Sequence, residues 1–133
     1  MESRRTAIVA LVLACSITIS CERGKPVEVE LDVYSGKPNP TWEIPPDQAS
    51  ALLAKVGSQR DDKATMADPG LGYRGFILRS GDRTIRVYGG LIEIQDPHGT
   101  HIVRDSANLE ATLAADARTR GYGNLVSGVS GAH

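Results

Sequence analysis

Asp96, His98 and His101 are neighbouring residues whose side chains could ligate a metal ion, and His133 near the end of the chain could join them. Imidazole and carboxylate groups are ligands that zinc and other divalent transition metals accept. On an extended strand, residues three apart point to opposite faces, so His98 and His101 converge only if the turn folds one of them back. The stretch is also an ordinary hairpin turn, and we expect no bound metal or other cofactor. A small metal-binding protein or metal-dependent enzyme using this tip is the alternative hypothesis.

Motifs for other kinds of catalysis are missing from the sequence. There is no Gly-x-Ser-x-Gly nucleophile elbow, and Gly36-Lys37 lacks the glycine-rich lead of a phosphate-binding loop. Asp61, Asp62 and Asp68 do not have the alternating spacing of a calcium loop. The sequence therefore favours a non-enzymatic protein.

The N-terminal segment reads as an export signal. Fourteen uncharged, mostly apolar residues at 6–19 follow Arg4 and Arg5. That run is short for a permanent membrane span, but it has the length and basic flank of a signal-peptide core. We predict a signal peptide at 1–20.

Two cysteines in this segment resemble the lipid-attachment site of bacterial lipoproteins, which are cut just before an acylated cysteine. Val12-Leu13-Ala14-Cys15 and Thr18-Ile19-Ser20-Cys21 both have a small residue before the cysteine. A cut at Cys15 would leave a signal core of only nine residues, so Cys21 is favoured.

The lipoprotein resemblance implies an address in the bacterial cell envelope. A thiol-linked lipid on Cys21, with the three acyl chains such proteins carry, would hold the domain at a membrane through a short tether at 21–26. A plain secretory cut, which would leave a soluble periplasmic or secreted protein, is the alternative. With Cys21 acylated, no cysteine would remain for a disulfide.

Charge and size limit the partners of the exported chain. Without residues 1–20, 13 basic side chains face 15 acidic ones, which gives no general attraction to nucleic acid. We therefore predict no nucleic-acid partner. About 110 residues suffice for one domain, which we place at 27–121.

The elements of this domain follow from apolar periodicity. Alternation at 27–33 predicts a strand with one buried face, and a stripe of apolar residues after Pro45-Pro46 predicts a helix that stops at Gly57. Two hairpins follow, with turns at Gly81-Asp82 and at 96–100. A last helix is capped by Asp105 or Ser106. Its core-facing residues are predicted to be Leu109, Leu113 and Ala117.

The expected fold is therefore α+β. An antiparallel sheet of about five strands carries two helices on one face, in the order β-α-β-β-β-β-α. The other face should be polar, with acidic residues of the first strand beside arginines of the first hairpin. A flexible Gly- and Ser-rich tail is expected at 122–133.

The stretch between the first strand and the first helix is a candidate recognition loop. Its residues are Ser35, Gly36, Lys37, Pro38, Asn39, Pro40, Thr41 and Trp42. The prolines stiffen the loop and Gly36 permits a positive φ, while Trp42 supplies a large ring for contact with a partner. The same residues also suit a loop that caps the core, with Trp42 buried and Asn39 bonded to nearby backbone. We expect burial of Trp42, the single tryptophan of a chain poor in aromatics.

This loop resembles the Ser-Gly-[Arg/Lys]-Pro-Asn-Pro-x-Trp signature of a family of small, uncharacterised bacterial exported proteins. The likeness extends to Gly70-Leu71-Gly72-Tyr73-Arg74-Gly75-Phe76, to Tyr88-Gly89-Gly90 and to the closing helix. The resemblance implies export but assigns no activity and no site. The expected function is that of a lipid-anchored, non-enzymatic envelope module that binds an envelope protein or a small ligand.

Overall fold

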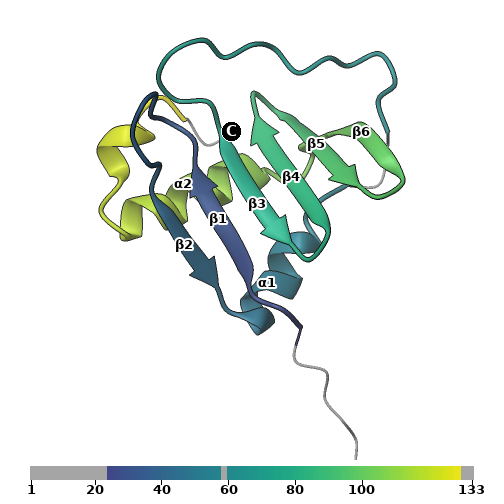
Figure 1. Cartoon of the computed structure of the whole chain (residues 1–133), viewed down its shortest axis with the longest axis horizontal. Coiled ribbons are helices and arrows are strands. Elements are labelled where there is room, and N and C mark those ends of the chain that lie inside the picture. Colours follow the sequence, from purple (N-terminus) through teal and green to yellow (C-terminus); the bar gives the residue numbers. More distant parts are fainter. Residues whose placement is uncertain (1–23, 58–59, 130–133) are drawn as a thin grey trace, which may run out of the picture.

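Alternating apolar residues build six strands in the computed structural model, which describes residues 24–57 and 60–129 (Figure 1). The strands are β1 (Val27–Leu31), β2 (Thr41–Ile44), β3 (Phe76–Ser80), β4 (Arg83–Tyr88), β5 (Leu91–Asp96) and β6 (Gly99–Arg104). They form one antiparallel sheet in the order β2-β1-β3-β4-β5-β6. The predicted signal peptide and Cys21 lie outside the described residues. Within 24–57 and 60–129, no helix has the length and apolar character to cross a membrane.

The α+β class and the antiparallel sheet are as predicted, but the strand count differs. The sheet has six strands because β2 pairs with β1, from Val27 opposite Ile44 to Glu30 opposite Thr41. From the sequence alone, this stretch is expected to belong to the loop before the first helix. Its alternation covers only four residues, and Pro40 and Pro45 flank it, so local pattern does not distinguish it from a loop.

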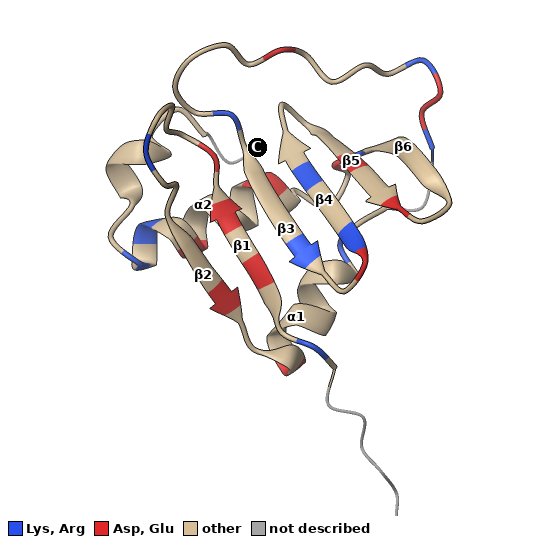
Figure 2. Ribbon diagram, viewed as in Figure 1, with Lys and Arg blue, Asp and Glu red and all other residues tan. Residues whose placement is uncertain are grey.

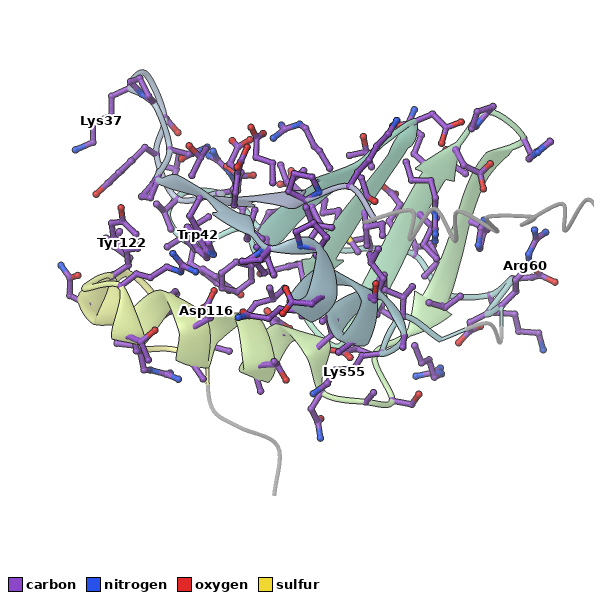
Figure 3. All side chains as sticks on the ribbon, turned by 90° about the horizontal axis from the view of Figure 1, so that it is seen from below. Lys37, Trp42, Lys55, Arg60, Asp116 and Tyr122 are labelled. Atoms are coloured by element: carbon purple, nitrogen blue, oxygen red, sulfur yellow. The ribbon has the colours of Figure 1, made fainter. Side chains whose placement is uncertain are left out.

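Two helices cover one face of the sheet, α1 (Pro46–Leu53) and α2 (Leu109–Thr119). Both lie behind the sheet in Figure 1, and Figure 3 shows them together on one side of it. Proline suits the first turn of α1 because its missing N–H is not needed there. This helix ends at Leu53, earlier than the predicted stop at Gly57, and a turn follows in which Val56 N donates to Leu53 O (3.1 Å).

The core lies between the sheet and the helices. Cross-strand register aligns two rows of apolar side chains, which contain respectively Val29, Leu78, Ile85 and Ile94, and Leu31, Phe76, Val87, Ile92 and Val103. None of these residues is more than 3% exposed. The predicted inner residues of α2 complete this layer and are equally buried, which confirms the helical face. Burial of each such side chain stabilises the fold by about 1.5–3 kcal/mol.

The opposite face of the sheet is polar, as predicted. Acidic residues lie on β1 and β2 and arginines on β3 and β4 (Figure 2). Arg79 donates to Glu28 Oε1 (2.9 Å) and to Glu30 Oε2 (2.7 Å), so charges on neighbouring strands pair with each other. Exposed pairs of this kind contribute little to stability, and we assign no site to this face.

The chain after α2 packs on the domain over its described part. Residues Gly123–Leu125 form a short 3₁₀ helix, and Val126 is fully buried. The Arg118 side chain donates to the carbonyl oxygens of Val126 (3.2 Å) and Val129 (2.8 Å). The predicted flexible tail spans 122–133, and its described part, residues 122–129, packs on the domain.

Candidate functional site

The hairpin tip considered for metal binding does not form a metal-holding group among the described residues. Pro97 and His98 form the turn between β5 and β6, and His98 N donates to Asp96 Oδ1 (2.8 Å). His101 lies within β6, opposite Ile94. Within the described ranges, no three or more His, Cys, Asp or Glu side chains are placed to hold a metal ion. His133 lies outside them.

A hollow of about 70 Å³ at this tip also includes Arg60 in its lining. The positive charge of its guanidinium group would repel a metal cation bound at the same place. Asp96, His98 and His101 line this hollow together with Arg60, but in the described part of the chain they do not form a group that could hold a metal ion, so the geometry gives the alternative hypothesis no support at this tip.

Asn39 fixes the base of the motif loop. Its side-chain oxygen accepts hydrogen bonds from Val33 N (3.1 Å) and Tyr34 N (2.8 Å). Its amide nitrogen donates to Glu30 Oε1 (2.8 Å) and to Asp32 Oδ1 (3.2 Å). The expected hydrogen bonding of Asn39 to nearby backbone is confirmed. The Asn39 side chain also bonds to two carboxylates, one in β1 and one directly after it.

Arg74 joins the motif loop to the segment that precedes β3. It donates to Asp32 Oδ1 (2.6 Å), to Tyr34 O (2.8 Å) and to Ser35 Oγ (3.2 Å). This pairing, more than any other contact, lowers the pKa of Asp32. The motif loop and the stretch at 70–76, which both belong to the family resemblance, therefore contact each other directly.

Trp42 belongs to the core, as expected, and not to a recognition surface. It is 9% exposed, its ring stacks on that of Tyr122 (5.8 Å between centroids), and its indole N–H donates to Asp116 Oδ2 (2.8 Å). Figure 3 shows Trp42 and Tyr122 together between the sheet and α2. The Arg120 guanidinium lies 5.3 Å from the Trp42 ring centroid. Trp42 therefore ties the edge strand β2 to α2.

The tip of the motif loop is exposed. Ser35, Gly36, Lys37 and Pro38 all lie at the surface, and Gly36 has the positive φ (83°) that its glycine permits. Lys37 Nζ lies 3.8 Å from the centroid of the Tyr34 ring. The predicted recognition loop is thus divided into an exposed tip and a base that serves the fold.

A hollow of about 430 Å³ lies at the end of the sheet where the motif segments meet. We call it the sheet-end hollow. Its lining residues are Tyr73, Tyr88, Gly89, Gly90, Glu110, Gly128 and Val129. The rings of Tyr73 and Tyr88 are 6.0 Å apart between centroids and inclined by 51°. Its volume falls in the range of small-molecule sites.

The polar groups of the sheet-end hollow are fixed by hydrogen bonds. The Tyr73 hydroxyl donates to Glu110 Oε1 (2.7 Å), and Gly90 N donates to Glu110 Oε2 (3.3 Å). Burial, and then this hydrogen bond, raise the pKa of Tyr73 well above its ordinary value. The phenol therefore stays protonated and keeps the Glu110 carboxylate in place.

Leu71 stands next to this hollow in the chain and is 89% exposed. It is flanked by Gly70 and Gly72, both with positive φ (67° and 91°), which shape a tight projecting turn. A lone exposed leucine is unremarkable by itself. Leu71 is not among the residues that line the hollow, but it precedes Tyr73 by two positions and projects from the surface.

A second cavity, of about 260 Å³, lies between α1 and α2. Its apolar wall includes Leu52 and Leu113, and at its rim Lys55 Nζ donates to Thr112 Oγ1 (3.2 Å). Figure 3 shows Lys55 on the helix side of the molecule, away from the motif loop. The two charged residues in its lining, Lys55 and Asp116, both make hydrogen bonds within the domain, to Thr112 and from Trp42, and we assign no ligand to this cavity.

Sequence reasoning named the pieces of the sheet-end hollow without joining them. Tyr73, Tyr88, Gly89 and Gly90 belong to the stretches over which the family resemblance extends, but nothing in the sequence connects them with Glu110. Hydrophobic periodicity carries no signal for this site, because its residues come from a loop, the end of a strand, two turns and a helix start. Comparison of the chain with protein-family models, with curated proteins and with solved structures finds no match in any of the three.

Proposed function

We propose that the protein is a lipid-anchored, non-enzymatic binding module of the bacterial cell envelope that meets its partner at the sheet-end hollow. The observation that carries this proposal is the hollow itself, with two tyrosines and a fixed carboxylate in its wall. The motif loop of the chain also resembles the signature of a family of exported bacterial proteins, which supports a place in the cell envelope. A freely secreted or periplasmic protein with the same binding surface is the alternative.

The position of the hollow agrees with an anchor at Cys21. The described chain enters β1 at the lower end of the sheet in Figure 1, six residues after Cys21. The motif loop, the start of β3 and the turn after β4 lie at the other end. The five residues of β1 separate the two ends by about 17 Å. A lipid on Cys21 would thus leave the sheet-end hollow facing away from the membrane.

The anchor is tested by the intact mass of the protein from membrane and soluble fractions of a bacterial host. We expect a membrane-bound chain that begins at Cys21 and carries acyl chains. Cys21→Ala should abolish the acylated product, and Cys15→Ala, the matched control, should leave it unchanged. A soluble, unmodified product cut elsewhere would contradict the anchor.

The binding surface is tested by photo-crosslinking in cells. A photoreactive p-benzoylphenylalanine replaces either Leu71, an exposed residue two positions before Tyr73, or Asp82, an exposed residue of the β3–β4 turn at the tether end. We expect a discrete adduct from position 71 and none from position 82. Equal adducts from both positions, or none from position 71, would contradict a partner at this end of the domain.

A further inference from the structure

The aromatic residues of the domain differ in whether the chain itself supplies them with a cation. Lys37 lies over Tyr34, and Arg120 lies over Trp42. The Tyr73–Tyr88 pair has no such partner among residues 24–57 and 60–129. Of the described rings without such a partner, these two are the ones that line the sheet-end hollow, where a cation from outside could reach them.

The geometry of the pair suits such a cation. Cation–π attraction acts within about 6 Å of a ring centroid. Because the two centroids are only 6.0 Å apart, one charged group in the sheet-end hollow can lie within that distance of both rings.

Glu110 adds a negative charge to the same wall. Its two hydrogen bonds come from neutral donors, the Tyr73 hydroxyl and the Gly90 amide, which fix the carboxylate without neutralising it. In the described part of the chain, no Lys, Arg or His forms an ion pair with Glu110. A carboxylate has about four acceptor positions, so two remain for a ligand.

Among the described residues, the hollow is open on the side of its glycines. A Cβ built at Gly89, Gly90 or Gly128 would meet no atom within 4 Å. A ligand group can therefore approach past these three glycines.

From these observations we propose that the sheet-end hollow binds an ammonium group, held against the Tyr73 and Tyr88 rings from the side of the hollow and paired with Glu110. The inference rests on the proposed function, since it names the chemistry of the ligand at that surface. Because the hollow would face away from the membrane that a lipid on Cys21 enters, the amine side chain of a peptide is the proposed source of this group. A lipid headgroup offers the same charge, and the experiment separates the two.

The direct test is an amide NMR titration of the purified protein with three probes. Choline represents a headgroup, Nα-acetyl-lysine-N-methylamide represents a peptide amine, and 3,3-dimethylbutanol is the uncharged isostere of choline. We expect saturable shifts of the Gly89 and Gly90 amide signals with at least one charged probe. The tighter of the two identifies the source, and the neutral isostere should bind at least about tenfold more weakly.

Matched variants locate the binding. Tyr88→Leu should weaken binding of the charged probe by about tenfold, whereas Tyr88→Phe keeps the ring and should change it by less than about threefold. Gly128→Leu should block the hollow, and Ser127→Leu, one residue away on the exposed surface, should not. The spectrum of each variant reports whether it folds.

The proposal is overturned if neither charged probe shifts these glycine signals, if the neutral isostere binds as well, or if Tyr88→Leu and Gly128→Leu leave binding unchanged. A crosslink from position 71 together with absence of ammonium binding would reject the ligand class and keep the binding surface. Loss of that crosslink would reject the surface itself.

Discussion

At the residue scale, Asn39 uses both donor and both acceptor positions of its side-chain amide within the domain. The amide is the one uncharged side chain that can accept from two backbone N–H groups and donate to two carboxylates at once. This explains the place of asparagine between two prolines in the motif loop. The prolines hold the loop extended, and the amide fixes it to β1.

Asn39→Asp tests this role. The substitution replaces the donor nitrogen by an oxygen that faces Glu30 and Asp32, so two hydrogen bonds are exchanged for repulsion between carboxylates. We expect the free energy of unfolding at pH 7 to fall by about 2–3 kcal/mol, measured by urea denaturation. Asn124→Asp, on an exposed residue of the 3₁₀ helix, is the control and should change it by less than about 0.5 kcal/mol. Equal losses in the two variants would contradict the role of Asn39.

The carboxylates beside Asn39 make stability depend on acidity. The hydrogen bond from Asn39 lowers the pKa of Glu30 below its ordinary 4.5, and the bond from Arg74 lowers the pKa of Asp32 below its ordinary 3.8. A depressed pKa in the folded state stabilises the protein above the unfolded value, and this stability is lost as pH falls through the folded value. The protein should therefore lose stability below about pH 4.5.

Arg74→Gln tests the Asp32 part of this dependence. It should lower the free energy of unfolding by about 1 kcal/mol at pH 7, because the ion pair is largely shielded from solvent. It should also make the loss of stability below pH 4.5 shallower, since Asp32 then titrates closer to its ordinary value. Urea denaturation at a series of pH values measures both effects. Parallel pH profiles for the two proteins would refute the assignment.

At the element scale, α2 begins without a side-chain cap from its own N-cap residue. Asn108 adopts a left-handed conformation (φ 54°), and its side chain makes no capping hydrogen bond. Asp105 supplies the cap from further back, accepting from Leu109 N (2.6 Å) and Glu110 N (2.9 Å). This same cap positions Glu110 at the sheet-end hollow.

Asp105→Ala should therefore lower the free energy of unfolding by about 1–2 kcal/mol. Ser106→Ala provides the control, because the sequence offered both residues as caps and only Asp105 is bonded to the helix start. Thermal unfolding followed by circular dichroism would show a lower midpoint for the first variant and an unchanged one for the second. A larger loss of stability in Ser106→Ala would contradict the assignment of the cap to Asp105.

At the scale of the whole molecule, the domain continues past α2. Val126 is fully buried, and Tyr122 stacks on Trp42, so residues 122–129 complete the core at the β2 edge. The predicted boundary at residue 121 would cut through this packing. The segment also supplies Gly128 and Val129 to the wall of the sheet-end hollow.

Chains that end at Val129 and at Gly121 test where the domain ends. The shorter chain should be less stable by about 3 kcal/mol or more, because it loses a buried valine and the aromatic contact of Trp42. Its tryptophan fluorescence should also shift toward longer wavelength as Trp42 becomes exposed. Equal stability of the two chains would place the boundary at 121, as the sequence alone predicts.

Local periodicity by itself determined the α+β class, both later hairpins and the buried faces of the helices. The turn at Gly81-Asp82 and the inner row with Leu109 and Leu113 are examples, because their signals come from residues adjacent in sequence or one helical turn apart. The signal peptide and lipidation of Cys21 also rest on sequence alone and stay predictions.

Tertiary structure alone decided strand β2, the packing of residues 122–129 and the sheet-end hollow. Trp42 meets Asp116 across 74 positions of sequence, and Tyr73 meets Glu110 across 37. Such pairs produce no periodic pattern in the sequence, because the hydrogen-bond partner of each residue comes near it only in the folded domain. The physical reason is that alternation records which face of an element is buried, whereas a binding site depends on which elements end at the same place.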